Sequence, residues 1–186
     1  MSMTYPLHVA GLKRDLTLCR VNDELYIAGF VIFGDVELTQ ACARELLKKA
    51  PEYDILITAE AKGIPLAYEM ARQAGTNRYL IARKVPKLYM KNVFTVKVNS
   101  ITTAKEQTLC IDQEDADFMR GRRVLIVDDV ISTGESLRAV EELVKQAGGN
   151  IVGKMAILAE GDATERDDII YLEKLPLFNP DGTEKA

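Results

Sequence analysis

Apolar residues follow two alternating patterns along most of the chain. Short runs rich in aliphatic and β-branched residues predict buried strands, at 55–59, 79–82, 124–127 and 151–158. Apolar residues at helical spacing predict one helix before these runs, at 36–49, and two between them, at 64–74 and 137–147. This alternation predicts an α/β fold, with a Rossmann-like parallel sheet core and helices on both of its faces.

Residues with special backbone preferences mark the ends of the predicted helices. Asp35 suits the cap of the first helix and Pro51 ends it. Pro65 fits the first turn of the second helix, and Gly148 and Gly149 stop the third. The helices therefore have defined starts or stops.

Several segments lie outside the strand–helix repeat. The runs 16–20 and 25–33 predict an N-terminal hairpin. Alternating residues at 93–98 and a return at 107–111 predict a second pair of strands, joined by a turn. Glu114, Asp115 and Asp117 form an acidic connection to the next strand.

We expect a single domain over residues 1–186. An α/β core at 37–160 would carry a small hood, made by the hairpin at 1–36 and by residues 161–186, over the open edge of its site. A last short strand is predicted at 169–172, and the tail from Pro180 is expected to be mobile.

The segment after the third strand concentrates polar chemistry. Asp128 and Asp129 follow the apolar run. Small and hydroxyl residues come next: Ser132, Thr133, Gly134 and Ser136. Ligands of open α/β sheets lie beyond the carboxyl ends of the strands, and the N–H groups of a helix start suit a phosphate. Two carboxylates suit sugar hydroxyls, or Mg²⁺ held through water. Together these groups predict a site for a phosphorylated ribose.

Two plainer interpretations of the paired aspartates exist. Asp128 and Asp129 could merely cap a helix in a Rossmann-like fold, or they could end a Walker-B strand. The Walker-B interpretation requires a P-loop, and the sequence G-x-x-x-x-G-K-[ST] does not occur in the chain.

Residues 124–136 resemble, without a gap, the binding motif for 5-phosphoribosyl 1-pyrophosphate (PRPP) of the type I phosphoribosyltransferases. The motif is an apolar run, two acids, two apolar residues and a small-residue loop that ends in Ser or Thr. The resemblance covers roughly residues 32–159 and implies the fold of that family, with Mg²⁺ held by Asp128 and Asp129 through water and PRPP. The PRPP-binding residues that it implies are Glu60, Ala61, Lys62, Gly63, Arg83, Asp128, Asp129, Val130, Ile131, Ser132, Thr133, Gly134, Glu135 and Ser136.

The loop 60–63 is the second motif. It follows a strand and precedes a helix, so it should lie at the same sheet end as Asp128. The family grips pyrophosphate with this loop, and adenine-type members typically have Arg where this chain has Lys62. The alternative is an ordinary turn with a solvated lysine.

The basic loop that begins at Arg83 is the third motif. Residues 83–88 read R-K-V-P-K-L and match the R-K-x-x-K-L pattern typical of adenine-type members. Its cations would neutralise a pyrophosphate leaving group. The catalytic residues implied by the resemblance are Lys84 and Lys87 of this loop, together with Asp128 and Asp129. The alternative is a solvated basic loop.

The base-binding residues implied are Phe33, in a sequence that resembles the family's F-R-D triplet, and Ile131. Phe33 could equally be plain core. Two departures bear on the base. Residues 96–103 lack the catalytic Glu of adenine-type members and look more like xanthine-type members. Gly161 stands where xanthine-type members carry a Lys. No donor for a 6-oxygen is evident, so adenine is favoured.

The resemblance therefore implies a glycosyltransferase that transfers 5-phosphoribosyl from PRPP to a purine base in purine salvage. The alternatives are a xanthine- or guanine-type enzyme, an enzyme for orotate, uracil or another base, and a PRPP-sensing regulator without catalysis.

Composition narrows the partners. A 47% hydrophobic share suits a packed core, and a net charge of −4 does not favour nucleic acid. No apolar run is long enough to span a membrane. Cys19, Cys42 and Cys110 are far apart, which indicates reduced thiols of a cytoplasmic protein. His8, the single histidine, lies near a terminus, which disfavours Ser-His-Asp chemistry. We expect a homodimer, as the family commonly forms.

Overall fold

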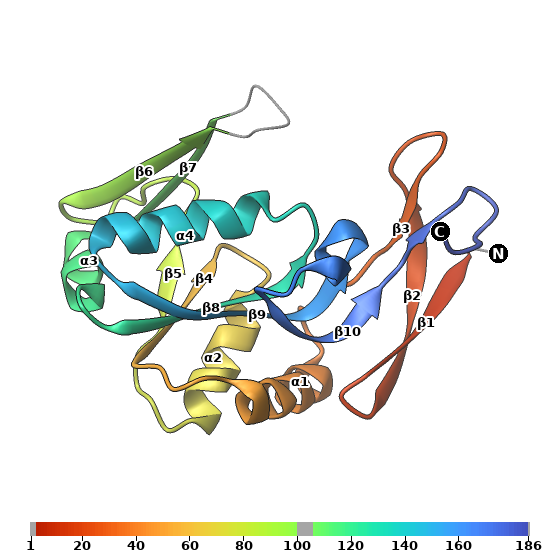
Figure 1. Ribbon diagram of the computed structural model, residues 1–186, viewed down its shortest axis with the longest axis horizontal. Coiled ribbons are helices and arrows are strands. Elements are labelled where there is room, and N and C mark those ends of the chain that lie inside the picture. Colours follow the sequence, from red (N-terminus) through yellow and green to blue (C-terminus); the bar gives the residue numbers. More distant parts are fainter. Residues whose placement is uncertain (1–2, 100–105, 186) are drawn as a thin grey trace.

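Five parallel strands form the central sheet of the computed structural model, which describes residues 3–99 and 106–185 (Figure 1). In spatial order they are β10 (Ile170–Leu175), β9 (Asn150–Glu160), β8 (Arg123–Ile131), β4 (Ile55–Ala59) and β5 (Leu80–Ala82). All four pairings are parallel. The predicted α/β fold class is confirmed, and the sheet includes β10, beyond the expected core limit at residue 160.

Alternate residues of β8 face opposite layers. Leu125 and Val127 pack with α1 (Val36–Lys49) and α2 (Ile64–Gln73). Val124 and Ile126 pack with the other layer, which includes α4 (Glu135–Ala147). Both faces are covered, which explains why the strands read as continuous apolar runs.

The predicted cap of α1 is present and connects two parts of the fold. Asp35 accepts a hydrogen bond from the backbone N–H of Leu38 at 3.0 Å. Its carboxylate also accepts from Nε of Arg14, at 2.6 Å, on β2 (Leu12–Arg20). The Arg14 hydrogen bond holds the pKa of Asp35 below its usual value. The cap should contribute about 1 kcal/mol to stability.

Both chain ends build the hood, a second sheet in the order β1–β2–β3–β11. It contains β1 (Thr4–Val9), β2, β3 (Tyr26–Ala28) and β11 (Leu177–Phe178), and its pairings are antiparallel. The sequence predicted one N-terminal hairpin, whereas the structure has two. Figure 1 shows this sheet beyond the end of the central sheet at which β10 finishes.

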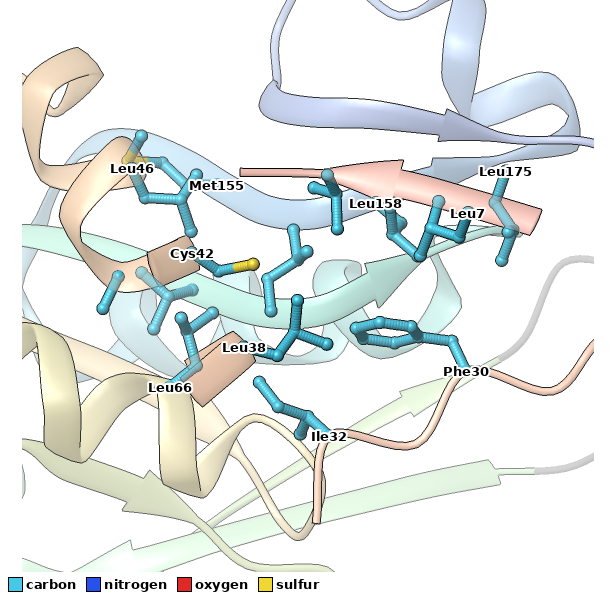
Figure 2. Packing of buried hydrophobic residues seen from close by; sticks show 14 of the residues in the cluster. Leu7, Phe30, Ile32, Leu38, Cys42, Leu46, Leu66, Met155, Leu158 and Leu175 are labelled. Carbon is cyan, nitrogen blue, oxygen red and sulfur yellow. The ribbon is translucent and has the colours of Figure 1, made fainter. Parts of the chain in front are cut away.

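The hood shares its core with the α1–α2 layer. Leu7 of β1 and Phe30 lie in one cluster with Leu158 and Leu175 of the central sheet (Figure 2). Cys42 is fully buried in the same cluster, and burial raises the pKa of its thiol to about 12. This continuity fixes the hood against the carboxyl ends of the strands.

Two expectations for the surface segments were wrong. The acidic connection is a helix, α3 (Gln113–Met119), which buries Ala116 and Met119. Its acids lie on the opposite side, and Asp115 pairs with Arg78 at 2.6 Å. Because most residues of this short helix are polar or charged, the sequence pattern did not indicate a helix.

The tail is not free either. The backbone N–H of Lys185 donates to the carbonyl of Leu177 at 2.7 Å, and Phe178 is 2% exposed. Residues 177–185 therefore fold back onto the hood.

The second predicted strand pair is present as an antiparallel arm. It consists of β6 (Val93–Asn99) and β7 (Glu106–Asp112) and packs on α4 through Val96 and Leu109. Residues 100–105, which hold the predicted turn, lie outside the described residues. Within the described part of the chain, no helix is both long and apolar enough to cross a membrane.

Candidate active site

The two aspartates lie within β8 and not after it. β8 continues to Ile131, and Asp128 is in register with Ala156 of β9. The apolar run alone predicts an end at Val127, because adjacent aspartates are disfavoured in a strand. Pairing with β9 holds both carboxyl groups on regular backbone at the carboxyl end of the sheet.

A buried carboxylate and one cation form the centre of the site. Asp129 is 3% exposed, and its Oδ2 atom lies 3.2 Å from Nζ of Lys62 in the loop between β4 and α2. Among the described residues, this Oδ2 accepts no hydrogen bond of good geometry, although the ammonium group is near. A buried acceptor in this state suits a donor on a ligand, such as a sugar hydroxyl.

Asp128 has an unusual protonation equilibrium. It is partly buried and accepts the N–H of Asp129 at 2.9 Å. Burial, followed by the negative charge of Asp129, raises the pKa of the Asp128 carboxyl above its usual value, against the opposing effect of Lys62. Such perturbation by burial and a like charge is typical of functional sites.

Gly63 brings the loop 60–63 into contact with this carboxyl pair. A Cβ added at Gly63 would stand 2.1 Å from Oγ1 of Thr58 and 3.1 Å from Oδ1 of Asp128. The backbone therefore approaches Thr58 more closely than a side chain would permit, and Asp128 lies close beside it. The sequence predicts that the two loops meet, and the structure brings them together.

Glu60 organises the basic loop. Its Oε1 atom lies 3.1 Å from Nη1 of Arg83 and 3.5 Å from Nζ of Lys87. Its Oε2 atom accepts the backbone N–H of Lys84 at 3.4 Å. The pKa of the Glu60 carboxyl lies below its usual value. Burial raises this pKa, but the Lys84 amide and the charges of Lys87 and Arg83 lower it by more. One carboxylate thus gathers two cations beside the loop 60–63, and the Lys84 side chain is exposed.

The turn before α4 is shaped by Gly134. This residue has φ +75°, a left-handed conformation that favours glycine, and it provides no side-chain cap for α4. Thr133 Oγ1 lies 3.5 Å from the backbone N of Glu135, a long contact. Ser132 is partly exposed and Ser136 exposed. Polar groups at this helix start are thus accessible to an anion.

Arg166 was not predicted from the sequence. A Cβ added at Gly134 would stand 2.6 Å from Nη1 of Arg166, so the guanidinium lies directly on the turn. Residues 165–168 are all charged, and no sequence pattern connects them to Gly134. The sequence explained this glycine by ligand approach, whereas the structure shows two further reasons, backbone conformation and the guanidinium.

The proposed base-binding residues differ in environment. Phe33 is 51% exposed and is not a core residue, which removes the plain-core interpretation. Ile131 is 3% exposed and packs in a cluster with Leu137 and Ala163. Val130, its neighbour, packs against the α1–α2 layer. Base binding by Phe33 and Ile131 stays a prediction.

Residues 37–177 match the model of the phosphoribosyl transferase domain. The chain belongs to this family. The matched range includes all of the site residues described above except Phe33. A solved structure, that of an adenine phosphoribosyltransferase from Thermoanaerobacter pseudethanolicus, is similar with a TM-score of 0.64 and 23% identity, over 77% of this chain and 84% of that one. This likeness supports the type I phosphoribosyltransferase fold.

Curated relatives carry three different base names. An orotate phosphoribosyltransferase of Caldanaerobacter subterraneus is 29% identical over 76% of this chain and 64% of its own length. A xanthine phosphoribosyltransferase of Lactobacillus acidophilus is 30% identical over 67% of this chain and 66% of its own length. An adenine phosphoribosyltransferase of Oenococcus oeni is 33% identical over 66% of this chain and 67% of its own length. The chain thus matches somewhat under two thirds of the length of the orotate relative.

Proposed function

We propose that this chain is a purine phosphoribosyltransferase that transfers 5-phosphoribosyl from PRPP to a purine base, with adenine favoured. The products would be the nucleoside monophosphate and pyrophosphate. The observation that supports this most is the meeting of Asp128, Asp129, Lys62 and Gly63 at the end of β8, in a segment that matches the family.

Each part of PRPP has a suitable partner. Asp128 and Asp129 would accept hydrogen bonds from the ribose hydroxyls and favour the positive charge that develops at C1 of the ribose. The turn 132–136 would hold the 5′-phosphate. Lys62 and the basic loop would stabilise the negative charge of the leaving pyrophosphate.

Arg83, Lys84 and Lys87 would act together on the leaving group. Glu60 lies within ion-pair distance of Arg83 and Lys87, so it pre-orders these cations near the loop 60–63. Lys84 is exposed and can turn toward the pyrophosphate. In this proposal the carboxylate of Glu60 organises the cations, and its place among the PRPP-binding residues stays a prediction.

Mg²⁺ fits this site only together with substrate. No group of three or more His, Cys, Asp or Glu able to hold a metal ion occurs within residues 3–99 and 106–185. Asp128 and Asp129 supply the hard oxygen atoms that Mg²⁺ prefers. They would hold the ion through water, and PRPP oxygens would complete its shell. When bound, the ion would screen the charge of the pyrophosphate.

The base would lie near Phe33. Phe33 offers an exposed ring for stacking, and backbone carbonyls of residues 31–33 could accept from an amino group at C6. Gly161 provides no side-chain donor for a 6-oxygen. Adenine fits these groups better than an oxopurine does.

Other assignments have specific support. The xanthine and orotate relatives favour a different base, and a PRPP-sensing regulator would need the same PRPP groups.

A homodimer is proposed as well. Leu88 is 109% exposed and Tyr89 is 66% exposed on the basic loop, and a second copy would cover such apolar side chains. The free thiols Cys42 and Cys110 are buried, in keeping with the proposed cytoplasmic location.

A base panel tests the proposal. Purified protein is supplied with PRPP, Mg²⁺ and adenine, hypoxanthine, guanine, xanthine, orotate or uracil, and kcat/KM is measured. Adenine should exceed the others by at least about tenfold, because one unpaired buried polar contact costs at least about 1.4 kcal/mol. A preference for another base would refute the adenine assignment alone. Tight PRPP binding without turnover would indicate a regulator.

A further inference from the structure

Arg166 reaches the turn before α4 from a distant part of the chain. It follows the 3₁₀ helix η1 (Gly161–Glu165), and its Nη1 atom would stand 2.6 Å from a Cβ at Gly134. Gly134 itself leaves the space that the guanidinium occupies. The contact thus joins the segment after β9 to the turn that we propose binds the 5′-phosphate.

The guanidinium is fixed by a carboxylate. Nε and Nη2 of Arg166 donate to Oδ1 and Oδ2 of Asp168, both at 2.8 Å. This bidentate geometry sets the plane of the guanidinium. Nη1 is the nitrogen that these two bonds leave over, and it is the one that lies on Gly134.

Asp168 is held in turn by α4. It accepts from Nζ of Lys154, and Lys154 donates at 2.9 Å to Oε1 of Glu141 on α4. The Lys154 side chain is 15% exposed. The hydrogen bonds of Arg166 and Lys154 hold the pKa of Asp168 well below its usual range. Arg166 is therefore anchored to the same helix whose first turn it contacts.

Acidic residues surround the turn, so a bound phosphate would need a nearby cation. Asp128 and Asp129 lie at the end of the preceding strand, and Glu135 is the first residue of α4. Lys62 lies against Asp129, at 3.2 Å. A helix start contributes only about half a positive charge, whereas a sugar phosphate carries nearly two negative charges at pH 7. Arg166 adds a guanidinium at this turn, and Lys154 shares the carboxylate of Asp168 that partly offsets its charge.

We propose that Arg166 is a phosphate-binding residue. Its Nη1 donates to an oxygen of the 5′-phosphate, while Asp168 holds the guanidinium in place. The inference rests on the proposed function, and it names the side chain that makes the site select phosphorylated ribose.

Two probes separate this role from the other anion site. Ribose 5-phosphate and Mg²⁺-pyrophosphate are titrated by calorimetry into wild-type protein, Arg166→Met and Arg166→Lys. Ribose 5-phosphate should bind Arg166→Met at least about tenfold more weakly, as expected for a lost hydrogen bond to a charged group. Pyrophosphate should bind with unchanged affinity. Arg166→Lys, which keeps the charge, should retain an intermediate affinity for ribose 5-phosphate.

Arg123→Met is the matched control. Arg123 also pairs with an aspartate through its Nε and Nη2 atoms, which both donate to Oδ1 of Asp54, but it does so at the amino end of β8. Loss of this arginine should leave both affinities unchanged.

Salt dependence distinguishes a direct contact from a structural one. If Arg166 pairs with the phosphate, added salt should weaken ribose 5-phosphate binding less in Arg166→Met than in wild type. Parallel salt dependences, equal loss of both ligands, or unchanged ribose 5-phosphate affinity in the variants would overturn the inference. Absence of ribose 5-phosphate binding in wild type would instead refute the proposed function.

Discussion

The two ends of β8 carry opposite kinds of charge arrangement. At the amino end, exposed Arg123 pairs with Asp54 at 2.8 Å and with Glu52 at 2.8 Å. The side-chain hydrogen bond from Arg123 holds the pKa of Asp54 at about 2, its ionised form being favoured. At the carboxyl end, Asp128 and Asp129 lie side by side with Lys62 as their nearby cation. The first arrangement pairs its charges with one another, whereas the second leaves Oδ2 of Asp129 without a hydrogen bond among the described residues.

This difference separates stability from function along one strand. Exposed ion pairs whose charges are matched contribute little to the free energy of unfolding and need no further binding partner. Two carboxyl groups in one partly buried place destabilise each other and persist where a ligand uses them. The predictions below test the contrast.

Removal of both carboxylates should have the largest effect. Asp128→Asn with Asp129→Asn keeps the shape of the side chains but removes the charge at the end of β8, so turnover should fall by about a hundredfold or more. Circular dichroism should still show the native fold. Near wild-type turnover, or an unfolded variant, would contradict the role of these groups at the ribose.

A side chain at Gly63 should break the junction between the two loops. In Gly63→Ala the new Cβ would overlap Oγ1 of Thr58, at 2.1 Å, and the free energy of unfolding should fall by about 1–3 kcal/mol. Urea denaturation measures this. Because Thr58→Ala removes the overlapping atom, the double variant should recover part of the loss. Equal stabilities of single and double variants would show that the overlap is not the cause.

The pKa of Asp128 predicts how stability changes with pH. Burial and the negative charge of Asp129 raise its pKa in the folded protein above the value of about 3.9 in an unfolded chain. The folded state therefore holds this proton at pH values where the unfolded state releases it, so the contribution is complete below pH 4 and is lost as the pH rises through the raised pKa.

Asp128→Asn should remove this pH dependence. Relative to the variant, wild type should lose about 1 kcal/mol or more between pH 5 and pH 8, measured by urea denaturation at both values. Parallel pH profiles of the two proteins would show that the carboxyl is ionised throughout.

The smallest effect is expected at the amino end. Arg123→Met should lower the free energy of unfolding by less than about 1 kcal/mol, as for other exposed pairs, and salt should reduce the difference. Turnover should stay at the wild-type level. A large loss of activity would show that the two ends of β8 are coupled.

Much of the core could be predicted from the sequence because its signals are local. The period of apolar residues predicted β4, β8, β9 and α1, and the cap at Asp35 is where the sequence indicates it. The family motif at 124–136 also depends only on neighbouring residues.

The parts that the sequence did not reveal depend on distant contacts. α3 was hidden because its acids pair outward with residues such as Arg78, and the tail is ordered by backbone bonds to the hood. The contact of Arg166 with Gly134 and that of Glu60 with Arg83 join segments far apart in the chain. Charged residues of this kind look solvated until the fold places their partners.

PRPP titration tests the central claim most directly. Calorimetry with PRPP and Mg²⁺ is carried out on wild type, on Asp128→Asn with Asp129→Asn, and on Arg123→Met. The account predicts binding to wild type and Arg123→Met with the same affinity, and at least about tenfold weaker binding to the double variant, since hydrogen bonds to charged groups are lost. Equal affinity in all three proteins would contradict a PRPP site at the carboxyl end of β8.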